Sequence, residues 1–377
     1  MARIAIDIHA VGARLTGNET YIANLVTALA WMPGDESYLL YYRAPAGAVL
    51  ARRPRMQARP LGFFGYHPIP RLLLSFGRKL KRDGADLLHV QYVGPLAAPC
   101  PMIVMIHDLA FLHFPEAFRW DERLWMRLLI PRAAHRAAHV LTGSEFSRQD
   151  LIARYGLPPT KVTVTPYGVS SLYRPLRDRS LVRAVQTRYR LPEHFILAVG
   201  NIQPRKNLRR LVEAWSRARQ AGTIDAGLVI AGQESWGAGE TVQAAREVNL
   251  MDEIRFTGYV PVTDLPLLYN AADLFVYPSL FEGFGLPLLE AMACGTPVVA
   301  GANSAIPEVV GDAALLTDTA DVAALQAILE QVLRDRHLRE CLGAAGRRRA
   351  RQFTWRYCAL KTLEIYRTVL DRRETGE

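Results

Sequence analysis

Residues 274–300 read LFVYPSLFEGFGLPLLEAMACGTPVVA, and this stretch decides the fold. An apolar, strand-like run, Leu274–Tyr277, is followed by a glycine-rich turn, and Pro297–Ala300 forms a second such run. Between them, Pro287 suits the first position of a helix and Gly295 suits the position just after its end. A strand, a turn, a helix and another strand in this order indicate a parallel sheet covered by helices, which is an α/β fold.

The same alternation extends in both directions along the chain. Before residue 170 we predict strands at Ile4–Ile8, Tyr38–Tyr42, Leu87–Gln91, Met102–Ile106, Val140–Thr142 and from Lys161. After residue 192 further strands are expected at Phe195–Val199, Leu228–Ala231, Ile254–Phe256 and Ala314–Leu316. A chain of 377 residues also exceeds one ordinary core. The pattern therefore predicts domains at 1–170 and 193–352, a linker at 171–192 and a final helical segment at 353–377.

Composition indicates the cellular compartment and the kinds of partner to expect. No apolar run approaches the roughly 20 residues that span a bilayer, and the start of the chain does not resemble a signal peptide. The four cysteines have no paired short spacing, so a reduced, cytoplasmic chain is expected, without a disulfide framework. The net charge of +10 favours anionic partners. The segment Ile69–Arg82 mixes apolar and basic residues, which is typical of a helix lying on a membrane.

Two adjacent cations follow the predicted strand that ends at Val199. The sequence there is Gly200-Asn201-Ile202-Gln203-Pro204-Arg205-Lys206-Asn207, just before a predicted helix. The planar fork of an arginine and the point charge of a lysine together suit a diphosphate. The alternative is an exposed pair of cations near a helix start, where cations oppose the helix dipole.

The turn after Tyr277 offers a second anion-binding element. Because Gly283 and Gly285 leave the backbone uncovered, the amides of Phe284, Gly285 and Leu286 can point at an anion at the start of the helix. Glu282 lies before this helix and Glu290 within it, so one could contact a sugar and the other a ribose. A glycine-rich turn with two unrelated glutamates is the alternative.

The first domain carries weaker signals. His107 and Asp108 follow the predicted strand Met102–Ile106, at the sheet edge where ligands bind in such folds. Gly17 and Asn18 belong to a small-residue turn after the first strand and could cap a helix or meet a phosphate.

Missing motifs narrow the function. The chain has neither a Gly-x-Gly-x-x-Gly fingerprint nor a phosphate loop ending in Gly-Lys-Ser/Thr, which disfavours dinucleotide oxidoreductases and NTPases. It has no Asp-x-Asp pair either, so cationic side chains and helix amides would bind a diphosphate in place of a metal ion.

These residues resemble the retaining glycosyltransferases of family 4, also called group 1. The strongest match is Glu282-x7-Glu290 within residues 281–299, supported by Pro204–Asn207, Val229–Gly232, Ile306–Glu308 and Ile106–Asp108. The resemblance implies the GT-B fold: two Rossmann-like, doubly wound domains facing across a cleft, with a C-terminal helix crossing back to the N-terminal domain.

The resemblance also implies roles for single residues. Arg205 and Lys206 would bind the donor diphosphate, Glu290 the ribose hydroxyls, and Glu282 the transferred sugar. The remaining residues implied are His107 facing that sugar, Gly17, Asn18 and Asp108 on the acceptor side, Gly200 and Asn201 near the phosphates, Gly283, Phe284, Gly285 and Leu286 at the helix start, and Gly258, Tyr259 and Val260 at the base. Asn201 departs from the family pattern, since many members have an arginine there.

The function expected from this resemblance is a retaining, metal-independent hexosyltransferase without a cofactor. The donor is expected to be GDP-mannose, because Ile106-His107-Asp108 followed by Phe114-Pro115 is similar to mannosyltransferase-like subgroups, with a UDP-sugar as the alternative. The acceptor is expected to be a glycan or a lipid-linked molecule for surface polysaccharide or glycolipid synthesis, at the inner face of the cell membrane. A UDP-sugar-dependent glucosyltransferase, an inverting transferase, an epimerase, a glycoside hydrolase and a non-catalytic protein that binds anionic membranes remain as alternatives. No nucleic-acid partner is expected.

Overall fold

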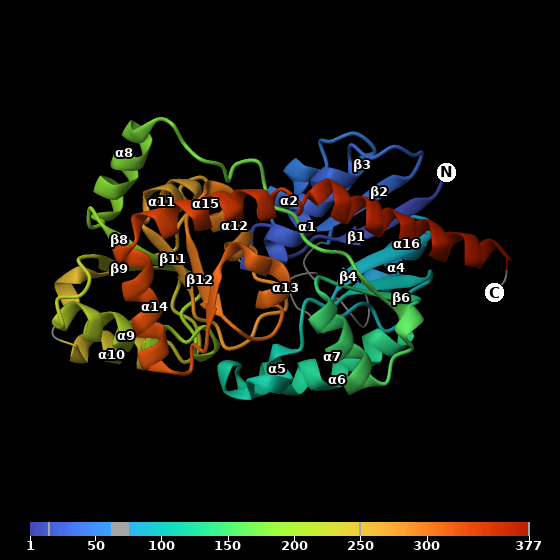
Figure 1. Cartoon of the computed structure of the whole chain (residues 1–377). Helices are drawn as coiled ribbons and strands as arrows, with labels where there is room; N and C mark the ends of the chain where they lie inside the picture. The colour runs from blue at the N-terminus through green and yellow to red at the C-terminus, as the bar shows by residue number, and fades with distance from the viewer. Residues whose placement is uncertain (14–15, 62–74, 249, 376–377) are drawn as a thin grey trace. The chain divides into compact units, whose positions relative to one another are not determined.

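The computed structural model describes residues 1–13, 16–61, 75–248 and 250–375, and the chain forms two compact units. Unit 1 contains Met1–Leu109, Leu124–Gly168 and Thr354–Glu377, and unit 2 contains Ala110–Arg123 and Val169–Phe353. Figure 1 shows the α/β character of both, with strands enclosed by helices. No helix in the described part of the chain is long and apolar enough to cross a bilayer.

Unit 1 is built on a seven-stranded sheet in the order β3-β2-β1-β4-β5-β6-β7. Its strands are β1 (Arg3–Asp7), β2 (Ser37–Tyr42), β3 (Met56–Pro60), β4 (Leu87–Gln91), β5 (Met102–Met105), β6 (His139–Thr142) and β7 (Val162–Val164), and all pair in parallel. The edge strand β3 was not predicted, because Met56 is its one buried residue and the others carry no apolar pattern.

The helices of unit 1 cover this sheet. They are α1 (Thr16–Leu29), α2 (Pro45–Leu50), α4 (Phe76–Arg82), α7 (Glu145–Tyr155), α16 (Trp355–Thr375) and most of α6 (Trp120–Arg136). The last helix, α16, packs on α1 and buries Leu363 and Tyr366 in the core of unit 1. The prediction that the C-terminal helix returns to the N-terminal domain is therefore confirmed.

The segment Ile69–Arg82 differs from the membrane-lying helix that its composition predicted. Residues 69–74 lie outside the described residues. In α4, Phe76 and Leu80 are fully buried, and the Phe76 ring packs edge-on against Tyr41 at 5.1 Å. The apolar side of this short helix therefore faces the core of unit 1 and is not available to a membrane.

Unit 2 contains a six-stranded parallel sheet in the order β10-β9-β8-β11-β12-β13. Its strands are β8 (Phe195–Val199), β9 (Gly227–Ala231), β10 (Ile254–Gly258), β11 (Leu274–Tyr277), β12 (Val298–Gly301) and β13 (Leu315–Thr317). Strand order reverses between β8 and β11, which are hydrogen-bonded neighbours. In doubly wound sheets such a switch point is where ligands bind, beyond the carboxyl ends of the strands.

Unit 2 is covered by helices on both sides of its sheet. They are α5 (Ala110–His113), α8 (Arg179–Tyr189), α9 (Leu208–Gln220), α10 (Gly239–Glu247), α11 (Leu265–Ala271), α12 (Leu286–Cys294), α13 (Ile306–Val310), α14 (Val322–Arg334) and α15 (Arg336–Ala350). The predicted ends of α12 are confirmed: Pro287 lies in its first turn, and Gly295 closes it in a left-handed conformation with φ 84°.

Two features of unit 2 differ from the sequence-based division of the chain. The predicted linker 171–192 contains α8, which packs on α11 and buries Val182 and Val185. These two residues have helical spacing, but the charged residues around them hid it. In addition, Ala110–Arg123, from within the predicted first domain, belongs to unit 2, where the His113 ring stacks on Phe281 at 4.5 Å.

Candidate functional site

The site is built on the loops that follow β8 and β11 at the switch point of unit 2. The loop after β8 forms a short 3-10 turn, Pro204–Lys206, and α9 begins two residues later. The two loops are tied together, because the Leu280 amide donates to the Arg205 carbonyl at 2.9 Å and the Asn207 side chain donates to the Pro278 carbonyl at 3.2 Å. Residues far apart in the sequence are thereby held in one place.

Three charged side chains meet between these loops. Arg205 Nη1 lies 3.1 Å from Glu282 Oε1, and Lys206 Nζ lies 2.5 Å from the same oxygen. Arg205 also donates to the carbonyl of Phe281, and Lys206 donates to the Tyr277 hydroxyl at 2.8 Å. All three charged side chains are nearly buried, with side-chain exposures of 8–12%. We call Arg205, Lys206 and Glu282 the charged triad.

The charged triad holds Glu282 ionised. Burial by itself would raise the pKa of Glu282, but Arg205 and Lys206 outweigh it and lower the pKa to about 2. Two cations and one carboxylate then carry one net positive charge among the three side chains. Two cations beside the start of a helix attract anions, so this arrangement can bind an anionic ligand.

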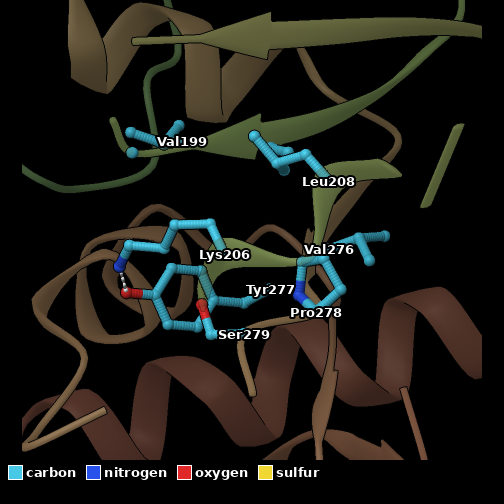
Figure 2. Close-up of a pocket in the computed structure, with 9 residues that line it drawn as sticks. Val199, Lys206, Leu208, Val276, Tyr277, Pro278 and Ser279 are labelled. Carbon is cyan, nitrogen blue, oxygen red and sulfur yellow. Dashed lines mark hydrogen bonds between the residues drawn. The ribbon is translucent and has the colours of Figure 1, made fainter. Parts of the chain in front are cut away.

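A small pocket, with room for about one water molecule, adjoins the triad. It is lined by the ends of β8 and β11 and by the side chain of Lys206, as Figure 2 shows. Val199, Leu208 and Val276 supply apolar walls, and the dashed line in Figure 2 marks the Lys206 hydrogen bond to Tyr277. The Lys206 ammonium also lies 4.8 Å from the Tyr277 ring centroid, an additional cation–π contact.

The backbone before α12 has the conformation that the glycines permit. Gly285 caps the helix with φ 98°, and a Cβ there would come within 2.8 Å of Leu288. The Glu282 amide donates to Ser304 Oγ at 2.9 Å, which fixes the start of the loop. Gly283, Phe284, Gly285 and Leu286 therefore lead directly from the charged triad into the positive end of the α12 dipole.

Glu290 has a different environment from Glu282. It lies within α12 and is 8% exposed, and its Oε2 accepts a hydrogen bond from the Tyr269 hydroxyl at 3.0 Å. Burial raises its pKa to about 7, although hydrogen bonds from Tyr269 and Tyr173 act in the opposite direction. This carboxyl group is therefore poised between its two protonation states near neutral pH.

His107 lies in unit 1, directly after β5, and is held by neutral partners. Its Nδ1 lies 2.5 Å from the Tyr167 hydroxyl and its Nε2 lies 2.7 Å from Gln91 Oε1. Burial, with a smaller contribution from His89, lowers the pKa of His107 to about 3. The imidazole is therefore neutral: it donates from Nε2 to Gln91 and accepts at Nδ1 from Tyr167.

The other predicted residues are divided between the two units. In unit 1, Gly17 and Asn18 lie in the first turn of α1, and Asp108 follows His107 and is half-buried. In unit 2, Gly200 and Asn201 follow β8; Gly200 has φ 145° and a Cβ there would touch the Lys206 side chain. Finally, Gly258 ends the edge strand β10, Tyr259 is exposed, and Val260 is buried.

Several residues at these sites were missed from the sequence. Tyr277 is the last residue of a predicted strand, and that position was a signal we could have used. Gln91, the last residue of the predicted strand Leu87–Gln91, offered the same signal. Tyr173, Tyr269 and Tyr167 carried none, because each reaches its glutamate or histidine only through the folding of distant segments.

Comparison with known families matches both parts of the chain. A family model described as "Glycosyl transferases group 1" matches residues 185–349, and one described as "Glycosyltransferase Family 4" matches residues 15–171. Among curated proteins, the chain is 36% identical over 266 residues to O-antigen chain mannosyltransferase B of Escherichia coli, covering 70% of each protein. It is 31% identical to a D-inositol 3-phosphate glycosyltransferase of Salinispora arenicola, covering 93% of this chain and 86% of the relative.

Solved structures share the fold at low sequence identity. Sucrose-phosphate synthase of Thermosynechococcus elongatus superposes with a TM-score of 0.77 at 23% identity, covering 98% of this chain and all of the other. Anabaena Alr3699/HepE, solved in complex with UDP and glucose, gives a TM-score of 0.76 at 19% identity over 98% of this chain and all of the other. These likenesses, with the two switch-point sheets, confirm the predicted pair of doubly wound domains.

Proposed function

Because the chain belongs to glycosyltransferase family 4, we propose that it is a retaining hexosyltransferase whose nucleotide-sugar donor binds at the charged triad of unit 2. The single observation that carries this proposal is the triad itself. Arg205 and Lys206 hold two nearly buried positive charges around Glu282, directly beside the glycine-capped start of α12. A diphosphate is the anion whose charge and size suit two cations and a helix N-terminus.

In the proposed reaction, the bond between the anomeric carbon of the sugar and the diphosphate oxygen breaks, and its electron pair stays on the diphosphate. The acceptor hydroxyl oxygen bonds to the same face of that carbon and gives its proton to the leaving phosphate. Arg205 and Lys206 stabilise the growing negative charge, which is electrostatic preorganisation and needs no metal ion. Because its pKa is held at about 2, Glu282 stays an acceptor for sugar hydroxyls and does not serve as an acid.

Glu290 is proposed to bind the ribose hydroxyls, and His107, with Gly17, Asn18 and Asp108, to contribute to sugar and acceptor binding from unit 1. A neutral His107 could contact an uncharged sugar without adding a charge. Gly200 and Asn201 would lie near the phosphates, and Gly258, Tyr259 and Val260 near the base.

GDP-mannose is the proposed donor, and a glycan or lipid-linked molecule is the proposed acceptor. The support is that O-antigen chain mannosyltransferase B and an MMP alpha-(1->4)-mannosyltransferase of Mycolicibacterium hassiacum are among the relatives. A UDP-sugar is the second candidate, since the similar Anabaena structure holds UDP and glucose.

A donor panel tests this proposal directly. The melting temperature would be measured with GDP-mannose, GDP-glucose, UDP-glucose and UDP-galactose, since a ligand that binds only the folded state raises it. Transfer from the stabilising donor would be followed in EDTA, and the anomeric configuration of the product would be read by NMR. No stabilisation by any nucleotide sugar would overturn the donor site, an inverted product would overturn retention, and loss of transfer in EDTA would overturn metal independence.

A further inference from the structure

The helix α6 exposes apolar side chains on its outward side. Its inner side is formed by Ile130, Ala133 and Ala134, which are buried. On the opposite side, Leu124, Trp125 and Leu128 are 50%, 49% and 43% exposed. In a water-facing helix these positions are ordinarily polar, and large apolar side chains gathered on one exposed face mark an interaction site.

Basic side chains accompany this apolar face. Arginines at positions 127, 132 and 136 of α6 are also exposed. By helical spacing, Arg132 and Arg136 lie on the same side as Trp125 and Leu128, and Arg127 lies at the edge of this side. In the part of the chain that the structure describes, no carboxylate forms an ion pair with Arg127, Arg132 or Arg136. The two acidic residues of the helix, Asp121 and Glu122, lie in its first turn, and Asp121 pairs with Arg119. The charge available along the rest of the outward side is therefore positive.

We define the α6 surface as three apolar and three basic side chains that all belong to unit 1: Leu124, Trp125, Leu128, Arg127, Arg132 and Arg136. Figure 1 shows α6 at the outer margin of the helices that enclose the unit 1 sheet.

The combination of side chains favours one kind of partner. Tryptophan has an apolar ring and a polar N–H, which suits the boundary between lipid headgroups and acyl chains. Leucines on the same face can enter the acyl region, and arginines beside them attract the phosphates of anionic lipids. A nucleic acid would use the arginines but leave the leucines exposed to water. We propose that the α6 surface binds the surface of an anionic phospholipid membrane.

This proposal replaces the segment that the sequence suggested for the same partner. In α4 the apolar side chains Phe76 and Leu80 are buried and only the cations remain outside, whereas in α6 both kinds of side chain are exposed together. It also stands apart from the donor site, because binding to vesicles can be measured without any transfer reaction.

The test is co-sedimentation of the full chain with large vesicles. Wild-type protein would be mixed with vesicles of phosphatidylcholine containing 30% phosphatidylglycerol, or of phosphatidylcholine alone, at about 0.1 M and 0.5 M salt, between which screening of surface charges rises steeply. We expect binding to the anionic vesicles that falls at least tenfold without phosphatidylglycerol and weakens at high salt. No binding to anionic vesicles would overturn the proposal.

Two variants locate the binding surface. The triple change Leu124→Ser, Trp125→Ser and Leu128→Ser removes the apolar side chains and should lower the bound fraction at least tenfold. The matched control is Trp31→Ser, since Trp31 is 73% exposed elsewhere in unit 1, and it should bind as wild type does. Equal loss in both variants, or no loss in the triple variant, would contradict the assignment to α6.

Further measurements test whether the triple variant is folded, whether the arginines contribute, and whether α6 binds a second copy of the chain instead. Urea denaturation would show that the triple variant is folded, and an Arg127→Glu, Arg132→Glu variant, which keeps the apolar side chains, should lose binding as well. Sedimentation velocity tests for a second copy as the partner. If wild type forms a dimer and binds no vesicles, and the triple variant is a monomer, the α6 surface mediates self-association. This result would overturn the membrane proposal.

Discussion

Glu282 and Glu290 belong to one continuous segment and are buried to nearly the same extent, at 6% and 8% exposure, yet their environments have opposite effects on ionisation. The pKa of Glu282 is lowered to about 2 and that of Glu290 is raised to about 7. Burial acts in the same direction on both carboxyl groups. The difference is that Glu282 faces Arg205 and Lys206, whereas Glu290 accepts hydrogen bonds from the hydroxyls of Tyr269 and Tyr173.

The comparison teaches that the two glutamates perform different tasks in the proposed enzyme. Glu282 is a permanent anion that orients two cations toward the donor. Glu290 is a group whose charge depends on pH and therefore on what binds beside it. The substitutions and pH changes predicted below alter the charges and hydrogen bonds around each glutamate.

The largest effect is expected from Lys206→Ala. Loss of this cation removes stabilisation of the leaving diphosphate, and turnover should fall about 10²–10³-fold, as for one preorganised donor. The fold should survive, because Arg205 remains 3.1 Å from Glu282. Steady-state kinetics give the turnover and circular dichroism checks the fold. Lys206→Arg, which keeps the charge, should lose less, and near-normal transfer by folded Lys206→Ala would exclude the assigned role.

The stability of unit 2 should depend on pH through Glu290. Its pKa is about 7 in the folded chain against an ordinary value of 4.5, so the folded state holds the proton more tightly. The stability that this provides is fully present below about pH 4.5 and is lost as the pH rises through 7, a change of about 3 kcal/mol. Glu282 has the opposite sign and loses stability as the pH falls from 4.5 toward 2.

Urea denaturation of wild type and Glu290→Gln at pH 5 and pH 8 measures the Glu290 contribution. The variant should gain stability relative to wild type by about 2.5 kcal/mol between the two pH values, because its amide does not ionise. A difference between the two proteins that stays constant over this range would mean that Glu290 titrates normally.

Donor binding should depend on the ionisation of Glu290 in the opposite sense to folding stability, and should be tighter at high pH. If the Glu290 carboxylate accepts hydrogen bonds from the ribose, donor affinity should rise between pH 5.5 and pH 8. At pH 8, Glu290→Gln should weaken donor binding about 10–100-fold, since a hydrogen bond to a charged group contributes about 1.5–3 kcal/mol. Isothermal titration calorimetry with the donor measures this, and an unchanged affinity at pH 8 would remove Glu290 from the ribose site.

The smallest effect is expected from Tyr173→Phe. The Tyr173 hydroxyl hydrogen-bonds Glu290 and lowers its pKa, so its removal should raise that pKa further. The midpoint of the donor-binding pH profile should move up by roughly 0.5–1 unit, because one neutral hydrogen bond contributes about 1 kcal/mol. Tyr269→Phe should shift the midpoint in the same direction. A downward shift in either variant would contradict the assigned hydrogen bonds.

The sequence predicted those helices and strands whose ends and patterns depend on neighbouring residues. The ends of α12 followed from Pro287 and Gly295, and most strands followed from runs of apolar residues. The edge strand β3 was not predicted, because it buries one side chain and lacks an apolar pattern. The helix α8 was not predicted although Val182, Val185 and Tyr189 repeat with helical spacing, because charged and polar residues surround them.

The candidate site was predictable only in part, for a related reason. That Arg205, Lys206 and Glu282 each follow a strand could be recognised from the sequence, and the pairing of β8 with β11 brings them together. The raised pKa of Glu290 could not be predicted, because it depends first on burial and then on hydrogen bonds from Tyr269 and Tyr173. Both arise only after α11 and the segment before α8 have packed. Membrane binding was predicted for Ile69–Arg82 from its apolar and basic composition. Composition does not show which apolar side chains are buried in the core.

The order in which the chain leaves the ribosome gives the return of α16 to unit 1 a further meaning. The larger part of unit 2, Val169–Phe353, is inserted between Gly168 and Thr354. The ends of this part are adjacent, since the Val169 amide donates to the Phe353 carbonyl at 3.1 Å. The core of unit 1 therefore lacks Leu363 and Tyr366 until all of unit 2 has been synthesised, and unit 1 cannot complete its fold before then. Unit 2 can therefore complete its fold before unit 1 receives its last helix.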